Sequence, residues 1–523
     1  MKYNQTMGLE ESSPKFPGGR PPPILVLPDE ASSNTPTIRQ ARDAVQYHAI
    51  NNNAEHRPLT LNHELRRARV KTSSGFFFWS EASLKRIVTE ERIEAQLSRG
   101  HDVPWDLQQL TNTILAHHMK VYAILTMLAK HDDIHETIQQ GVSDESLPLL
   151  QQSEDDDCPI LLNGEILSCF SHWSDADRDS FMNYKHQVNP VLLGRDRDTV
   201  ELDKSAILPI IHEEFVTRAG FGEVSRVQLH PECHTFRDVL PSVDTTEWFA
   251  LKRLVPRERG DLSKQALGFK KEVDALQRLH NRPNQHIVTL LATWAIEDSV
   301  RDRYCLLFPW AEGDLKSYWQ REKCPCSGAK MDLNAIQWVT KQILGMADAL
   351  KTIHSPNTLE PKQKYGRHGD IKAENILWYP PSVKSRRGTL VIADLGLTEF
   401  KSTQSRSNVP GEGLSATPGY RPPECDLKGG TVSRAFDIWT YGCLLLEMVC
   451  WMLGGQKFLD EFEDHRMTPG IHGPDTDIFF EICSKGSRVS QNEMQLQETS
   501  ESAYCKHAVA VKGEVHEVSR SPV

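Results

Sequence analysis

The stretch His368-Gly369-Asp370-Ile371-Lys372-Ala373-Glu374-Asn375 places a carboxylate, an ammonium and an amide at offsets of 0, +2 and +5. Phosphoryl transfer from ATP uses these groups. A carboxylate accepts the proton of the attacking hydroxyl, a cation neutralises the phosphoryl group, and an amide oxygen holds a magnesium ion. Nineteen residues after Asn375 comes Asp394-Leu395-Gly396, which supplies a second acidic position. Together the two stretches predict a site for nucleotide-dependent chemistry.

The composition excludes several classes of protein. The 523 residues carry a formal net charge of −11, which argues against a nucleic-acid binder because phosphate contacts need a basic surface. The longest apolar run, Tyr441 to Leu453, has 13 residues and is shorter than the roughly 20 needed to span a membrane. Eleven cysteines without a regular spacing indicate a reduced, intracellular chain, cytoplasmic or nuclear.

The first 200 residues divide into two parts. Residues 1–60 are rich in Pro, Ser, Asn and charge, and we interpret them as a disordered tail. Residues 75–200 carry apolar residues at helical spacing after a possible cap at Ser80, which predicts a helical N-terminal region. The acidic run Glu154 to Asp157 reads as a linker within it. Such a region could dock a protein partner.

From about Ile207 the pattern changes to short β-rich runs. The predicted strands are Phe215-Val216, Glu223 to Leu229, Trp248 to Leu254, Ile287 to Thr293 and Tyr304 to Phe308. One predicted helix, Lys264 to Leu279, interrupts them, and after Asp314 the pattern is mainly helical. Strands with one helix, followed by a helical region, predict a two-lobed α+β fold.

A phosphate-covering turn is predicted at Gly220 and Gly222, followed by Val224, because glycines let the backbone approach phosphate oxygens closely. Thr217 and Ala219 occupy two further places where glycines would be expected. An ordinary glycine-containing β-turn explains this local sequence about as well.

Ala250-Leu251-Lys252 lies on a predicted strand 28 residues after Val224, and Glu272 follows Lys252 by 20 residues on the predicted helix. An ion pair between Lys252 and Glu272 would hold the lysine against phosphates. Taken alone, Glu272 fits a solvated helix face shared with Asp274. The order of the other elements favours the ion pair.

These features follow one another in an order that resembles the eukaryotic protein kinases, over residues 207 to about 450. The shared features are the glycine turn, Lys252, Glu272, His368 to Asn375, Asp394-Leu395-Gly396, Pro422-Pro423-Glu424 and Asp437 to Gly442. We assign a kinase-like domain to residues 207–483. The helical N-terminal region, with Phe308-Pro309-Trp310-Ala311 at the hinge position, is also similar to a group of filamentous-fungal kinase-like proteins.

The resemblance implies a role for each residue of the catalytic loop. Asp370 would be the base that accepts the hydroxyl proton, and Lys372 would neutralise charge on the γ-phosphate. Asn375 and Asp394 would hold Mg²⁺. Lys372 and Thr417 are typical of kinases that phosphorylate Ser and Thr of protein substrates.

The resemblance also implies a nucleotide site between the lobes, where Lys252 and Glu272 would orient ATP. Further contacts to the nucleotide would come from Gly220, Gly222, Val224, Ala250 and the hinge Phe308 to Gly313. A small-molecule phosphotransferase of related fold is a remoter alternative. Pro422-Pro423-Glu424, which shapes a peptide groove in protein kinases, argues against it.

Two features depart from the family pattern. Gly369 replaces the arginine that clamps a phosphorylated activation loop, so phosphorylation of that loop should matter less. Residues 484–523 are polar and serine-rich, and they predict a disordered tail where the family has packed helices. The large lobe therefore reads as incomplete at its C-terminal end. A catalytically weak scaffold, or pseudokinase, is the alternative function.

Overall fold

The computed structural model describes most of the chain from Thr60 onward. The described residues are 60–98, 106–147, 149–151, 160–162, 165–194, 199–219, 222–236, 248–254, 262–280, 283–296, 303–326, 331–355, 364–381, 385–402, 409–410, 417–426, 429–467, 477–484 and 507–511. Residues 1–59 of the predicted tail 1–60 lie outside them, as do the acidic run Glu154 to Asp157 and Gly220.

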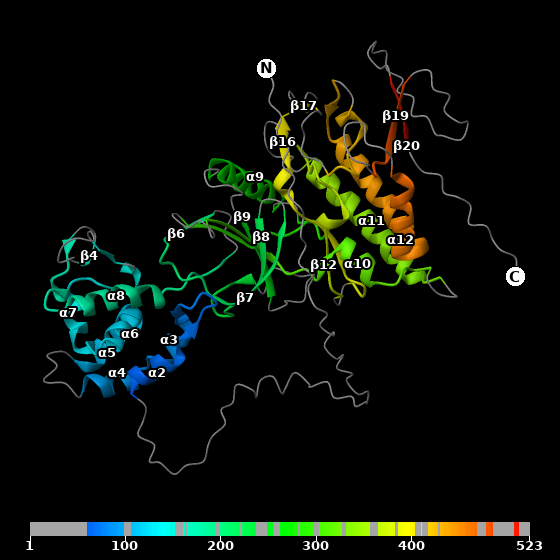
Figure 1. Ribbon diagram of the computed structural model, residues 1–523. Coiled ribbons are helices and arrows are strands. Elements are labelled where there is room, and N and C mark those ends of the chain that lie inside the picture. Colours follow the sequence, from blue (N-terminus) through cyan, green and yellow to red (C-terminus); the bar gives the residue numbers. More distant parts are fainter. Residues whose placement is uncertain are drawn as a thin grey trace, which may run out of the picture. The chain divides into compact units, whose positions relative to one another are not determined.

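A helical module precedes the kinase-like part, as the apolar spacing predicted (Figure 1). Its helices are α2 (Leu61–Ala68), α3 (Glu81–Ile87), α4 (Glu90–Leu97), α5 (Leu107–Thr113), the π-helix Ile114–His118, α6 (Met119–Met127), α7 (Ile134–Gln139) and α8 (Asp175–Gln187). Its short strands are β1 (Val70–Lys71), β2 (Phe77–Phe78), β3 (Leu150–Gln151), β4 (Ile160–Leu162) and β5 (Glu165–Ile166). Single-turn 3₁₀ helices lie at His131–Asp133, Asp144–Ser146 and Ser168–Phe170.

The capping prediction in this module is confirmed. Ser80 is the N-cap of α3, and its hydroxyl accepts a hydrogen bond from the backbone N–H of Ser83, which satisfies one of the free donors at the helix start. Leu84 and Ile87 are buried in the module's core. Gly141 ends the α7 region at φ +75, a backbone conformation that favours glycine.

The small lobe is built on a six-stranded sheet with the order β6-β10-β11-β9-β8-β7. Its strands are β6 (Val200–Leu202), β7 (Ile210–Ala219), β8 (Gly222–Leu229), β9 (Trp248–Leu254), β10 (Ala292–Ile296) and β11 (Tyr304–Pro309). Helix α9 (Leu262–His280) is the single long helix among the described residues of this lobe. Four predicted strands and the predicted helix are thereby confirmed in position.

One strand is displaced from its prediction. The run Ile287 to Thr293 was expected to be extended, but β10 begins at Ala292. Ile287 and Val288 are buried, and Ile287 makes only an isolated bridge to Ile392. Their apolar character therefore reflects burial in the core rather than pairing in the sheet.

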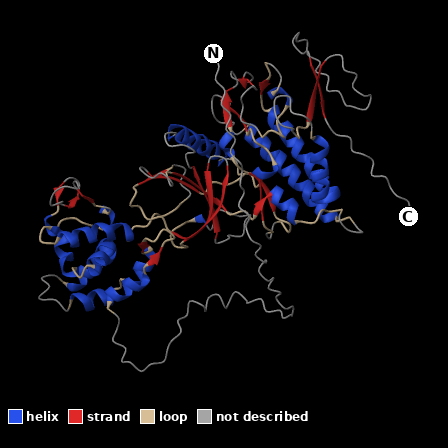
Figure 2. Ribbon diagram, in the orientation of Figure 1, coloured by secondary structure: helices blue, strands red, loops and turns tan. Residues whose placement is uncertain are grey.

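The large lobe begins after the hinge and is mainly helical (Figure 2). Its helices are α10 (Leu315–Arg321), α11 (Leu333–His354) and α12 (Ala435–Arg466), with 3₁₀ turns at Ala373–Asn375, Leu395–Leu397 and Pro423–Cys425. Its strands are β12 (Gly313–Asp314), β13 (Lys364–Arg367), β14 (Ile376–Tyr379), β15 (Thr389–Ile392), β16 (Glu399–Ser402), β17 (Val409–Pro410) and β18 (Thr431–Val432). The α+β, two-lobed prediction is confirmed.

Helix α12 is the core helix of this lobe. Leu444, Met448 and Trp451 are buried in one cluster with residues of α10 and α11, as the apolar run predicted. By length and composition α12 is the one helix of the described residues that could cross a membrane, but core helices pass the same test. The chain kinks at Gly455, which has φ +71 and ψ −159.

The C-terminal region contains one element that composition did not predict. His507–Val511 form β20, which pairs antiparallel with β19 (Phe480–Ser484). The segment His-Ala-Val-Ala-Val is a short β-prone run, and it lies within the stretch predicted to be a disordered tail. The paired partner Phe480 is buried and contacts Trp439.

Candidate active site

The loop that carries Asp370 connects β13 to β14, and α12 contacts its backbone. Buried Asp437 accepts hydrogen bonds from the backbone N–H groups of His368 at 2.7 Å and Gly369 at 2.8 Å. The ring of His368 contacts the carbonyl oxygen of Ala393 at 3.0 Å, next to Asp394. One buried carboxylate and one buried ring thus fix the backbone of the loop before Asp370 against the strand that precedes Asp394.

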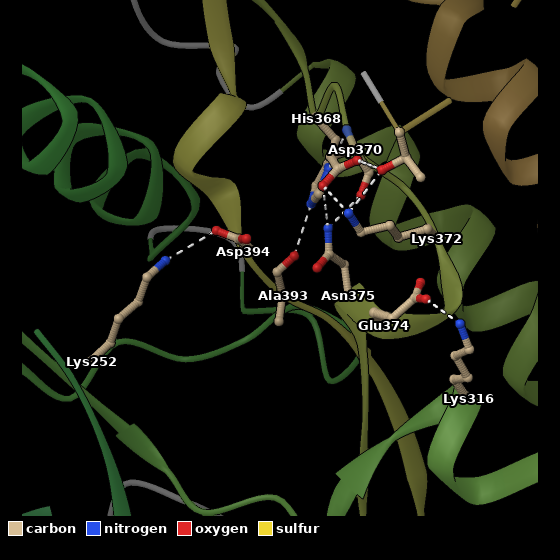
Figure 3. A network of polar contacts seen from close by, with 10 residues as sticks. Lys252, Lys316, His368, Asp370, Lys372, Glu374, Asn375, Ala393 and Asp394 are labelled. Atoms are coloured by element: carbon tan, nitrogen blue, oxygen red, sulfur yellow. Dashed lines mark hydrogen bonds and ion pairs between the residues drawn. The ribbon is translucent and has the colours of Figure 1, made fainter. Parts of the chain in front are cut away.

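Asp370 lies at the centre of a cluster of polar groups (Figure 3). The side-chain amide of Asn375 donates to Oδ2 of Asp370 at 2.8 Å, and Nζ of Lys372 lies 2.8 Å from the same oxygen. The hydroxyl of Thr417 donates to Oδ1 at 2.8 Å and accepts from Lys372 at 2.8 Å. The predicted catalytic trio and Thr417 are therefore brought together.

A second cluster joins two elements of the small lobe to Asp394, which follows β15 of the large lobe. Nζ of Lys252, on β9, lies 2.7 Å from Oε1 of Glu272 on α9 and 3.1 Å from Oδ1 of Asp394. Figure 3 shows Lys252 reaching toward Asp394 from the opposite side to Asp370. Glu272 is 3% exposed, so it belongs to this cluster and not to a solvated helix face.

The charges of this cluster determine which groups are ionised. Burial alone would lower the pKa of Lys252, but the carboxylates of Glu272 and Asp394 raise it above its ordinary value. The Lys252 ammonium lowers the pKa of Asp394 to about 2. Burial raises the pKa of Glu272, and Lys252 acts in the opposite direction. Asp394 is thus the carboxylate that remains ionised most readily.

The backbone at Asp394 is strained. Its φ of +60 and ψ of +71 lie in the left-handed region, which costs a non-glycine residue about 1 kcal/mol or more. Gly396, two residues later, leaves little room for a side chain, because a Cβ there would lie 3.3 Å from Oδ1 of Asp394. Strain of this kind persists where the surrounding structure fixes a functional side chain.

The donor set fits a hard cation such as Mg²⁺, which prefers carboxylate and amide oxygens. The amide nitrogen of Asn375 makes two hydrogen bonds to Asp370, which leaves its oxygen as the donor for a metal. Asp394 supplies an ionised carboxylate. No group of three or more His, Cys, Asp or Glu among the described residues could hold a metal by itself, so Mg²⁺ would take further ligands from phosphates and water.

The other predicted nucleotide contacts lie on β8, β9 and β11. The Cα partner of Val224 is Lys252, and that of Phe308 is Ala250. A Cβ at Gly222 would lie 2.6 Å from the carbonyl oxygen of Arg253, so the close approach of two backbones requires glycine there.

Sequence reasoning missed a buried polar cluster beside α12. The hydroxyl of Tyr420 donates to Oε2 of Glu447, and Arg466 lies 3.7 Å from Oε1 of the same residue. Arg466 also lies 3.6 Å from Asp477. The available signal was Glu447, which interrupts an otherwise apolar run, since a buried carboxylate requires partners.

Glu424, in the Pro422-Pro423-Glu424 segment, is not an isolated buried carboxylate. It is half-buried, and it has an interaction partner.

Residues 237–474 match the family model described as Protein kinase domain. This part of the chain belongs to the eukaryotic protein kinase superfamily.

Individual relatives are similar to this chain at modest identity. A probable serine/threonine-protein kinase mps1 of Dictyostelium discoideum is 26% identical over 46% of this chain and 21% of its own length. A probable cell division protein kinase of Encephalitozoon cuniculi is 29% identical over 41% of this chain and 67% of its own length. The CTD kinase subunit alpha of Schizosaccharomyces pombe is 28% identical over 46% of this chain and 36% of its own length. The match thus spans between about a fifth and two thirds of these relatives.

Proposed function

We propose that this chain is an active protein kinase that transfers phosphate from ATP to Ser and Thr hydroxyls of protein substrates, with Mg²⁺. The observation that carries the proposal is the contact of Asp370 with Lys372, Asn375 and the Thr417 hydroxyl. A carboxylate that already accepts a hydrogen bond from one threonine hydroxyl at 2.8 Å is suited to accept one from a substrate hydroxyl.

The residues would divide the work as follows. Asp370 would take the hydroxyl proton, and Lys372 would neutralise charge on the transferred group. Lys252, held by Glu272, would orient the α- and β-phosphates, while Asn375 and Asp394 would hold Mg²⁺. A bound Mg²⁺ would neutralise charge that develops on the phosphate oxygens.

The remaining assignments are proposals of the same kind. Val224, Ala250, Phe308, Gly222 and Gly220 would line the nucleotide site, within a kinase-like domain spanning residues 207–483. We expect an intracellular protein, cytoplasmic or nuclear. The helical region, residues 75–200, would bind a protein partner. The CTD kinase subunit alpha of S. pombe is one fungal relative of this chain.

A catalytically weak scaffold is the second candidate. The feature that favours it is the end of β7, where Thr217 and Ala219 stand in place of glycines. Residues with a Cβ at these two places would keep the backbone farther from phosphate oxygens than glycines would. Such a protein would act through contacts with other proteins, without phosphate transfer.

The test is a kinase assay on the purified full-length chain with Mg²⁺-ATP and a generic Ser/Thr protein substrate, beside Asp370→Asn. We expect the variant to lose at least about a hundredfold in kcat. Equal phosphate incorporation by both proteins would eliminate catalysis by this site. Calorimetric titration with ATP, which needs no turnover, would then separate an ATP-binding scaffold from a protein that does not bind nucleotide.

A further inference from the structure

A stack of two aromatic rings and one guanidinium lies at the hinge end of the sheet. The Cζ of Arg226, on β8, lies 4.1 Å from the ring centroid of Trp248 on β9 and 5.2 Å from that of Trp310. Trp310 directly follows the end of β11 at Pro309. A single side chain therefore links two strands of the small lobe to the segment that connects the lobes.

The stack lies on the face of the sheet that also presents Lys252. Along β8, Val224, Arg226 and Gln228 are half-buried and alternate with buried residues. Along β9, Trp248, Ala250 and Lys252 do the same. Because alternate side chains of a strand share a face, these six belong to one face. Arg226 has Ala250 as its Cα partner, and Val224 has Lys252.

The rings supply the main contacts of the guanidinium. The carboxylate of Glu214 is 3.9 Å away, which is long for an ion pair. Among the described residues, no acceptor takes a hydrogen bond from the buried Nε. A planar guanidinium stacks on aromatic faces in a way that an ammonium does not. Arg226 is therefore placed by Trp248 and Trp310 more than by charge pairing.

We propose that Arg226 is a positioning residue for the nucleotide: by holding Trp310 against the small-lobe sheet, it fixes the hinge backbone at the purine end of the site. This inference rests on the proposed function, since it takes Phe308 to Gly313 as the hinge. Loss of the stack would free Trp310 and weaken nucleotide binding, while Asp370 and Lys372 would keep their positions for phosphate transfer.

The test compares Arg226→Met, Arg226→Lys and the control Glu214→Gln in the full-length chain. We expect Arg226→Met to raise KM for ATP about five- to twentyfold and to change kcat less than threefold. Arg226→Lys should recover only part of this, and Glu214→Gln should match the wild type. A fall in kcat with an unchanged KM in Arg226→Met would overturn the inference.

A double-mutant cycle with Trp310→Ala isolates the contact. If Arg226 acts through Trp310, the double variant should bind ATP no more weakly than the weaker-binding of the two single variants. Full additivity of the two losses would overturn the inference. ATP affinity measured by calorimetry keeps this test independent of turnover: a wild type that binds ATP without transferring phosphate refutes the proposed catalysis alone.

Discussion

Oδ2 of Asp437 accepts a hydrogen bond of 2.7 Å from the backbone N–H of His368, two residues before Asp370. The core helix α12 therefore sets the position of the loop that carries Asp370 directly. Asp437→Asn replaces an acceptor oxygen by a donor, so one buried N–H would lose its partner. We expect a loss of about 1–3 kcal/mol in the free energy of unfolding and at least a tenfold fall in kcat.

Chemical denaturation and the kinase assay would measure both effects. Exposed Asp464, near the end of the same helix, provides the matched control as Asp464→Asn. Unchanged stability and unchanged kcat in Asp437→Asn would show that this carboxylate does not hold the loop.

Glu272→Gln should weaken the cluster at Lys252 without removing Asp394. The variant loses a charge at 2.7 Å from Nζ of Lys252, so the lysine would keep its ion pair with Asp394 alone. We expect kcat/KM for ATP to fall at least tenfold. Asp274→Asn, an exposed change two residues along the same helix, should leave it within twofold. Similar losses in both variants would contradict a specific role for Glu272.

Glu447 should make stability depend on pH. Burial raises the pKa of this carboxyl from its ordinary 4.5 to about 7, against the hydrogen bond from Tyr420 and the charge of Arg466. The folded state therefore binds the proton more tightly than the unfolded state. Its contribution to stability is present below pH 4.5 and is lost as the pH rises through 7, by at most about 3 kcal/mol.

Thermal unfolding between pH 5 and pH 8 would measure this. Glu447→Gln should flatten the decline in melting temperature across that range, whereas Glu463→Gln, an exposed change on the same helix, should not. A slope identical to the wild type in Glu447→Gln would show that another group titrates.

Alanine at five hydroxyl residues that precede Thr417 in the sequence should leave most activity intact. Those residues are Ser402, Thr403, Ser405, Ser407 and Ser415. The reason is Gly369, which stands where the family has a phosphate-binding arginine and has φ +87. A side chain is strained at such a φ, so an arginine would not simply fit there. A large loss of kinase activity in the fivefold variant would refute this.

Sequence alone predicted the parts of the site that are contiguous in the chain. The contacts among Asp370, Lys372 and Asn375 could be predicted because the three residues lie within one short loop. The contact between Lys252 and Asp394 joins residues 142 positions apart. A local sequence pattern cannot predict a contact over that separation. The ion pair of Lys252 with Glu272 was foreseen only because the order of the other motifs suggested it.

The features that sequence missed depend on packing between distant segments. The contacts of Arg226 with Trp248 and Trp310 join three segments, and each residue alone reads as an ordinary strand or loop position. The displaced start of β10 has a simpler cause. Ile287 and Val288 are buried outside the sheet, and a buried apolar pair has the same hydrophobicity as part of a paired strand. Capping at Ser80 was predictable because it is entirely local.

The order of strands in the small-lobe sheet has a practical consequence for anyone who trims this gene. A polypeptide cut at residue 237, where the family match begins, would discard β6, β7 and β8, half of that sheet. Trp248–Leu254 would then become an exposed edge strand. Its unpaired backbone N–H and C=O groups could pair with the same strand of another molecule. Such a product should accumulate as insoluble aggregate in the host cell.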